Sequence, residues 1–204
     1  MEPIKIIEKG KYEIKIYQDM HPEDPRDGHN MGKMFCFHTR YNLGDEHEIK
    51  EERFKSWKQI REYLEELNYS IIIPIYLYDH SGLRMQTRPF HSRWDSGQIG
   101  FICCRDEDIV NCFGTNKVTN EDRDKAEKAL LKEVEIYDNY ISGNVYGYKA
   151  IKKVKVTVKK TYEDGSEKIY DTEEEIDVGS CWGFYDEDSL REHAEDDIEA
   201  DKNN

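Results

Sequence analysis

The chain has no apolar run long enough to cross a membrane. Its longest one, residues 71–77, is far shorter than the ~18 residues that a spanning helix needs. Its first residues lack the apolar stretch of a secretory signal. Cysteine is scarce: the five cysteines are odd in number and no two have Cys-x-x-Cys spacing, which favours reduced thiols. We therefore expect a cytoplasmic protein that does not enter a membrane.

The chain also lacks the motifs of familiar enzyme classes. It contains no Gly-x-Ser-x-Gly elbow, no P-loop and no His-Glu-x-x-His pair. We therefore predict no metal site, and the sequence identifies no cofactor. The adjacent Cys103 and Cys104 lie in a predicted strand, so their side chains should point to opposite faces. Core packing accounts for them better than a redox role does.

Positive charge is in short supply. The net charge is −14, and residues 186–204 hold nine acidic and two basic residues, which leaves −7 for the rest of the chain. Nonspecific binding of nucleic acid is therefore disfavoured, because phosphate affinity requires clustered cations. We expect residues 186–204 to form a flexible, solvated acidic tail. Such a tail could also attract a basic partner protein. The oligomeric state is not indicated.

Hydrophobic periodicity predicts an α+β fold. Alternating or β-branched patterns indicate strands at 12–17, 34–37, 70–78 and 99–103, although Pro74 in the third argues for an edge or a bulge. Apolar residues spaced by three or four predict two principal helices, over 51–67 and from the capping Thr119 to 141. Because no linker interrupts the pattern, we expect residues 1–185 to form one compact domain with a mainly antiparallel sheet.

The last third of the chain predicts a C-terminal β-hairpin over residues 151–178. A two-residue turn at Asp164-Gly165 would set the valines of the first strand against acidic residues. Slipping the pairing by one residue exchanges the faces and improves both packing and charge. We therefore predict a loop of at least three residues and the pairs Lys153–Asp177, Lys155–Glu175, Lys159–Asp171, Val154–Ile176 and Val158–Thr172.

Two polar stretches follow predicted strands and gather His, Asp and Arg side chains, as sites built on rigid scaffolds often do. The candidates in them are His38, Arg40, Asp45, His47, Asp79, His80, Ser81, Arg88, His91, Trp94 and Asp95, with Trp182 as a wall from a later aromatic segment. If the protein is an enzyme, we select His80, Asp95 and His38 as catalytic, because histidine titrates near neutral pH. The others are candidate binding residues.

Simple structural explanations compete with that hypothesis. Residues 79–82 and 95–97 are good Asx-turn sequences, and the arginines could pin loop carboxylates. Glu133, Glu135 and Asp138 could serve a site, but we expect them to lie mainly on the solvated side of their helix.

Several segments resemble a family of uncharacterised proteins associated with bacteriophages and other mobile elements. The matching pieces are FCFHTRYNLGD at 35–45, LYDHSG at 77–82, WDSGQIGF at 94–101, EVEIYD at 133–138 and SCWGFY at 180–185. No activity comes with this resemblance. It implies a small protein of phage or plasmid type, in the bacterial cytoplasm, that acts on host or phage machinery.

Two functional hypotheses follow. The first is an acidic accessory protein without enzymatic activity that binds a host or phage macromolecule, which we expect to be a protein with a basic surface. The alternative is a small hydrolase or nucleic-acid-processing enzyme with a His/Asp pocket between residues 38–47 and 79–95. Alanine substitution of His80 or Asp95 would separate them, because only the enzyme should lose activity.

Overall fold

The computed structural model describes residues 1–92 and 94–203, which form two compact units. One unit combines residues 1–22 with 143–204, and the other consists of residues 23–142. We call them the terminal unit and the central unit. Each contains one antiparallel sheet of four strands, which confirms the α+β class. The expectation of one domain over residues 1–185 was wrong, because the two ends of the chain pair with each other and residues 23–142 close a sheet of their own.

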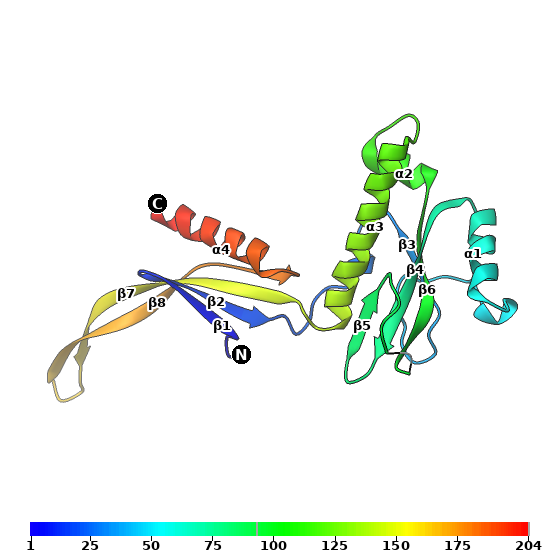
Figure 1. Ribbon diagram of the computed structural model, residues 1–204. Helices are drawn as coiled ribbons and strands as arrows, with labels where there is room; N and C mark the ends of the chain where they lie inside the picture. Colours follow the sequence, from blue (N-terminus) through cyan, green and yellow to red (C-terminus); the bar gives the residue numbers. More distant parts are fainter. Residues whose placement is uncertain (93, 204) are drawn as a thin grey trace. The chain divides into compact units, whose positions relative to one another are not determined.

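The central unit has three layers. Its sheet has the order β3 (Lys33–Cys36), β6 (Ser96–Arg105), β4 (Tyr69–Asp79), β5 (Leu83–Gln86). Helices α2 (Asp106–Phe113) and α3 (Asn120–Ile141) pack on one face, and α1 (Trp57–Glu66) covers the other (Figure 1). Cys104 belongs to the core under α3 and Cys103 to the core under α1, as their adjacency in a strand predicts.

Local signals account for both predicted helices. Helix α3 begins after Thr119, whose side chain and that of Asp122 form a capping box. Helix α1 is shorter than the predicted 51–67, because residues 51–53 form a separate 3₁₀ turn, η2 (Glu51–Arg53), and Ser56 caps the helix instead. Asn68, which follows it, has a φ of 65°, the left-handed conformation of a helix C-terminus.

Pro74 lies in a strand that is central in the sheet. Its pairing partner is Phe101 of β6, whereas β5 begins to pair with β4 only at Tyr76. The proline therefore occupies a stretch of β4 that has a strand on one side only, directly before the register shift between Ile75 and Tyr76. Both of the expected solutions, an edge and a bulge, contribute.

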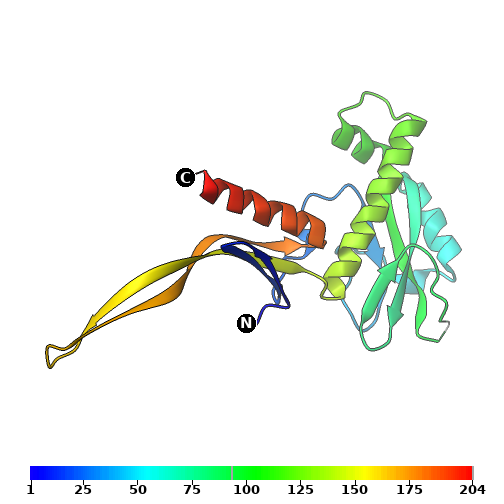
Figure 2. The same cartoon turned by 60° about the vertical axis from the view of Figure 1, so that its left-hand side comes forward.

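The terminal unit has the strand order β1 (Lys5–Lys9), β2 (Tyr12–Gln18), β7 (Tyr146–Thr161), β8 (Glu167–Phe184). Helix α4 (Glu187–Lys202) lies across one face of this sheet (Figure 2). Leu190, Ala194 and Ile198 on the helix are buried against β2 and β7. Residues 187–202 of the expected flexible acidic tail at 186–204 thus form an ordered amphipathic helix. Its three apolar residues, spaced by four, were outweighed in the sequence by the surrounding acids.

The carboxylates of α4 help to hold it in place. Asp201 accepts hydrogen bonds from the Tyr12 hydroxyl at 2.7 Å and from Lys152 at 2.7 Å, and Asp197 accepts one from Tyr148 at 2.6 Å. The pKa of Asp201 is lowered by these hydrogen bonds, that from Lys152 first. Part of the negative charge of this helix is therefore compensated within the unit.

The C-terminal hairpin forms with a three-residue loop, Glu163-Asp164-Gly165, closed by Tyr162 and Ser166. The faces are as predicted, but the pairing is shifted by two residues: Lys153 lies opposite Glu175, Lys155 opposite Glu173, Val154 opposite Glu174 and Val158 opposite Tyr170. A strand slipped by two keeps its faces, so periodicity alone cannot choose between these registers. The three-residue loop sets the register that forms.

Among the described residues, no helix has the length and apolar character needed to span a bilayer.

Candidate functional site

The two predicted polar stretches meet at one end of the central sheet. Arg40, after β3, places Nη1 3.0 Å from Oδ2 of Asp79, the last residue of β4. The Tyr41 hydroxyl lies 3.5 Å from the other oxygen of the same carboxylate, and the Tyr41 ring stacks on His38 at 5.1 Å. The backbone N–H groups of Arg40 and Tyr41 point at Nδ1 of that histidine, each at 3.3 Å. His38 thus anchors its own loop.

His80 and Asp95 form a second pair in the same region. Nδ1 of His80 lies 3.7 Å from Oδ1 of Asp95, and the Ser92 hydroxyl donates to the other oxygen at 3.1 Å. The carboxylate therefore lies between the serine and the histidine. A nucleophilic triad requires the histidine between the other two, so this arrangement does not activate Ser92. His80 is 63% exposed, in contact with water.

The remaining predicted residues divide among different surroundings. Ser81 has a φ of 53° and its hydroxyl donates to the neighbouring His80 carbonyl, as a turn requires. Arg88 and His91 are exposed, and Trp94 is 98% exposed. Trp182 belongs to the terminal unit, where its ring lies over Gly147 and 6.0 Å from the Tyr17 ring. Its surroundings there are those of an aromatic residue packed on a sheet face.

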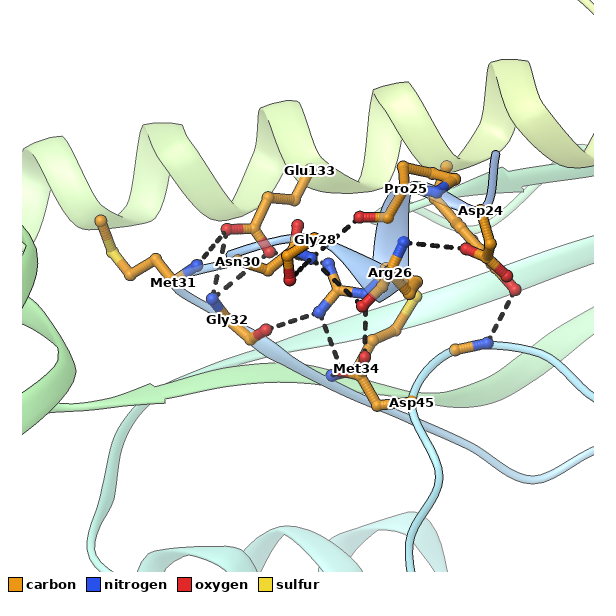
Figure 3. Close-up of polar contacts among 12 residues, drawn as sticks. Asp24, Pro25, Arg26, Gly28, Asn30, Met31, Gly32, Met34, Asp45 and Glu133 are labelled. Atoms are coloured by element: carbon orange, nitrogen blue, oxygen red, sulfur yellow. Dashed lines mark hydrogen bonds and ion pairs between the residues drawn. The ribbon is translucent and has the colours of Figure 1, made fainter. Parts of the chain in front are cut away.

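Asp45 belongs to a buried ionic network centred on Arg26, a residue for which the sequence offered no signal (Figure 3). The Arg26 side chain is 4% exposed and donates through Nε and Nη2 to Asp45 at 3.1 and 2.8 Å. Nη1 donates to Glu133 of α3 at 2.9 Å, and Nη2 to the Gly32 carbonyl at 2.6 Å. Burial disfavours the charged form, but hydrogen bonds to both carboxylates outweigh it and the pKa of Arg26 is raised.

This network joins three segments that are far apart in the sequence. Glu133 also accepts the backbone N–H of Met31 at 2.8 Å, and Asp45 accepts that of Met34. The expectation that Glu133 and Asp138 lie on the solvated side of α3 was therefore wrong. Asp138 is buried and accepts from Arg84 and from the N–H of Met85, whereas Glu135 is exposed as expected. The fully paired Arg26 network has the character of a structural clamp.

A hollow of about 850 Å³ lies beside this clamp, on the side of the sheet covered by α1. The residues that line it are Lys33, Phe35, Glu46, His47, Glu48, Ile49, Lys50, Arg53, Phe54, Tyr63, Leu67, Tyr69 and Arg105. Of these residues, only His47 is among the candidates that the sequence predicts. The four cations come from three separate parts of the chain, at 33, 50–53 and 105, and form no motif, so only the fold could bring them together.

The structure also presents a long hairpin segment that has no covering layer. We call residues 153–175 the arm, because β7 pairs with β2 only as far as Lys152. The arm continues beyond β1, β2 and α4 (Figure 1).

Among the described residues, no group of three or more His, Cys, Asp or Glu side chains could hold a metal ion. Comparisons with protein-family models, with curated proteins and with solved structures find no match.

Proposed function

We propose that this protein is a binding protein without enzymatic activity, and that its arm holds a basic, extended segment of a partner protein. The partner segment adds as a strand to the outer edge of β8. The resemblance to proteins of phages and mobile elements makes host or phage machinery the source of that partner. The observation that carries the proposal is the open acidic edge of β8.

Strand β8 lies at the end of the sheet order, and no strand within residues 1–92 and 94–203 pairs with its outer side. It is 18 residues long. An edge of this length presents a row of backbone N–H and C=O groups that can accept another strand. Recognition by strand addition uses these groups for affinity and the alternating side chains for specificity.

Charge selects the kind of strand that fits. The β7 side of the arm, residues 153–161, has four lysines and no acid. The β8 side, residues 167–175, has five acids and one lysine. Lysines on an edge strand discourage pairing, which protects the β7 side, whereas the acids along β8 favour a strand rich in Lys or Arg.

The arm also exposes apolar surface along its length. Val154, Val156 and Val158 are partly exposed on one face, and Ile169 and Tyr170 of the opposite strand are 65% and 41% exposed. A two-stranded ribbon in water is marginally stable by itself, since it can bury little of either face. A third strand would supply additional pairing and cover part of this surface.

Binding of designed peptides tests the proposal. Fluorescence anisotropy would compare a labelled peptide of four Lys-Val repeats with one of four Lys-Pro repeats, which has the same charge but half the backbone N–H groups. We expect the Lys-Val peptide to bind at least tenfold more tightly, because proline cannot complete a strand ladder. A peptide of four Glu-Val repeats should not bind.

Two charge-matched variants locate the site. The substitutions Glu173→Gln and Glu174→Gln remove two charges from the arm and leave Glu175, which pairs with Lys15, in place. Asp188→Asn and Glu192→Gln remove two from the exposed side of α4. We expect the arm variant to weaken binding of the Lys-Val peptide at least tenfold and the α4 variant at most twofold. Equal effects, or equal binding of both basic peptides, would leave nonspecific charge attraction as the explanation. Deleting α4 is not a usable test, because it uncovers the core of the terminal unit.

The contact between His80 and Asp95 supports the second candidate, a small hydrolase or nucleic-acid-processing enzyme. Its histidine would act as a general base, since it is exposed and paired with a carboxylate. The substitutions His80→Ala and Asp95→Ala should then abolish hydrolysis of ester, phosphodiester or peptide model substrates while the melting temperature stays unchanged. Absence of any such activity in the unmodified protein would remove this candidate.

A further inference from the structure

The hollow beside α1 has the opposite charge to the rest of the chain. Four cationic side chains line it, namely Lys33, Lys50, Arg53 and Arg105, and two glutamates, Glu46 and Glu48. Its lining is therefore net +2 in a protein whose net charge is −14. None of the four cations forms an ion pair with a carboxylate within residues 1–92 and 94–203. By contrast, Arg26, Arg40, Arg84 and Arg123 of the same unit are all paired. Unpaired cations gathered in one concave site favour an anionic ligand.

The Arg105 side chain packs on an aromatic ring. Its guanidinium carbon lies 4.6 Å from the centre of the Tyr69 ring. Its Nε is buried and has no hydrogen-bond partner among the described residues. A buried N–H without a partner is unfavourable, because it has lost water and gained no acceptor, and an acceptor from a ligand would remove this cost. A stacked guanidinium is suited to bidentate contact with a phosphate.

His47 presents a second buried nitrogen of different character. Its Nε2 lies 3.0 Å from the Cys36 carbonyl, which can only accept, so Nε2 carries the proton. The other nitrogen, Nδ1, is then an acceptor in the neutral ring, and it too is buried with no partner among residues 1–92 and 94–203. The complementary ligand group is a donor, such as a sugar hydroxyl or a ring amine. The residues that line the hollow therefore include cationic donors for an anion and one histidine nitrogen that has no partner among the described residues.

Aromatic side chains supply the third element. Phe54 and Tyr63 line the hollow, are partly exposed, and lie 5.3 Å apart between ring centres. Nucleic-acid bases stack on aromatic side chains of this kind in proteins that bind single strands. The volume of about 850 Å³ falls in the range of small-molecule sites.

We propose that this hollow binds a nucleoside phosphate, with the phosphate on Arg105 and Lys33, the sugar or base on Nδ1 of His47, and the base against Phe54 and Tyr63. This site is independent of the arm. It accommodates one nucleotide unit, either free or at the end of a single strand. The lining of the hollow is net +2, whereas the chain as a whole is net −14. We therefore expect affinity for phosphate at this hollow and little nonspecific binding of nucleic acid elsewhere.

Calorimetric titration of the full chain with AMP tests the proposal. Adenosine and inorganic phosphate serve as partial ligands, and a four-nucleotide thymidine strand with a 5′-phosphate represents a strand end. We expect AMP to bind at least tenfold more tightly than either partial ligand. Tighter binding of the strand than of AMP would identify a strand end as the source of the ligand. Phosphate that bound as well as AMP would overturn the role of the rings, and no binding of AMP or the strand at 1 mM (roughly the −4 kcal/mol threshold) would overturn the proposal.

Variants assign the binding to the hollow. Arg105→Gln should weaken AMP binding at least tenfold. Because Arg105 precedes α2 and its substitution could disturb that helix, Lys33→Gln provides a second variant at an exposed position, with an expected loss of at least threefold. Lys128→Gln is its matched control, since Lys128 is exposed on α3 and also makes no ion pair with a described carboxylate. Equal losses in the Lys33 and Lys128 variants would show attraction by overall charge and refute the site.

Discussion

Replacing Arg26 by methionine should destabilise the central unit strongly. Methionine keeps much of the apolar stem of Arg26 but removes the four hydrogen bonds described above. Asp45 and Glu133 would remain largely buried, 17% and 14% exposed, with no cation beside them. Breaking a buried ion pair from one side costs about 3–5 kcal/mol, because the remaining charge has lost both water and its partner. Since small domains are stable by roughly 5–15 kcal/mol, this loss is a large fraction of the total.

Urea unfolding followed by circular dichroism measures the effect. With an m value of about 2 kcal/mol per molar urea, the midpoint of the central unit should fall by roughly 2 M. The triple variant Arg26→Met, Asp45→Asn, Glu133→Gln removes the orphaned charges and should recover at least half of the loss. Hydrogen exchange at Met31 and Gly32, whose N–H groups donate to Glu133, reports the local consequence.

A matched control uses an exposed pair. The Arg40 side chain is 69% exposed and pairs with Asp79, so Arg40→Met should cost at most ~1 kcal/mol, the usual value for surface pairs. If Arg26→Met cost no more than Arg40→Met, the network would not be the clamp that its burial indicates. If the triple variant were less stable than Arg26→Met, the orphaned-charge explanation would be refuted.

The remaining predictions concern thiols and the C-terminal helix. In the native protein a thiol reagent should modify the exposed Cys112 and Cys181 at least a hundredfold faster than the other three thiols, and modification of all five at one rate would contradict the buried positions. Burial raises the pKa of Cys36 and of Cys104 from 9.0 to about 12. Each buried neutral thiol therefore keeps its full contribution to stability below pH 9 and loses it as the pH rises toward 12, because the unfolded chain ionises first. At pH 10 each thiol should lower the free energy of unfolding by about 1.4 kcal/mol, seen as a lower urea midpoint than at pH 8, and an unchanged midpoint would refute this. Leu190→Ala, at a fully buried position, should lower the stability of the terminal unit by about 2–5 kcal/mol in the same assay, and a loss below 1 kcal/mol would mean that α4 is not part of its core.

Much of the local structure could be predicted from the sequence. Helix α3 follows from the Thr119 cap and the apolar stripe after it, and β4 from its β-branched run. The loop of at least three residues was predicted because a two-residue turn would set the valines against acids, although the register that forms also places Val154 opposite Glu174. The enzyme hypothesis placed residues 38–47 and 79–95 around one pocket because both are rich in His and Asp, and Arg40 and Asp79 of these stretches do form an ion pair. These features depend on neighbours in the sequence or on a period of two or about 3.6 residues.

Sequence patterns gave wrong predictions for helix α4 and for the register of the hairpin. Acidic residues hid the apolar stripe of α4, and a strand slipped by two residues keeps its alternation. Composition averages over a segment, whereas burial depends on which few side chains face a neighbour. Leu190, Ala194 and Ile198 become core residues only because β2 and β7 provide the surface that they cover.

The sequence by itself therefore determined the α+β class, the main helices and strands, and the thiol side chains that point to opposite faces of β6. Tertiary structure alone decided the division into two units, the clamp around Arg26 and the cationic hollow. Each of these depends on groups that are distant in the chain: β2 pairs with β7, Arg26 meets Glu133, and Lys33 lines the same hollow as Arg105. Local periodicity places a side chain on a face of its own helix or strand. Which other face it meets depends on contacts between residues that are 72 or more positions apart in these three cases.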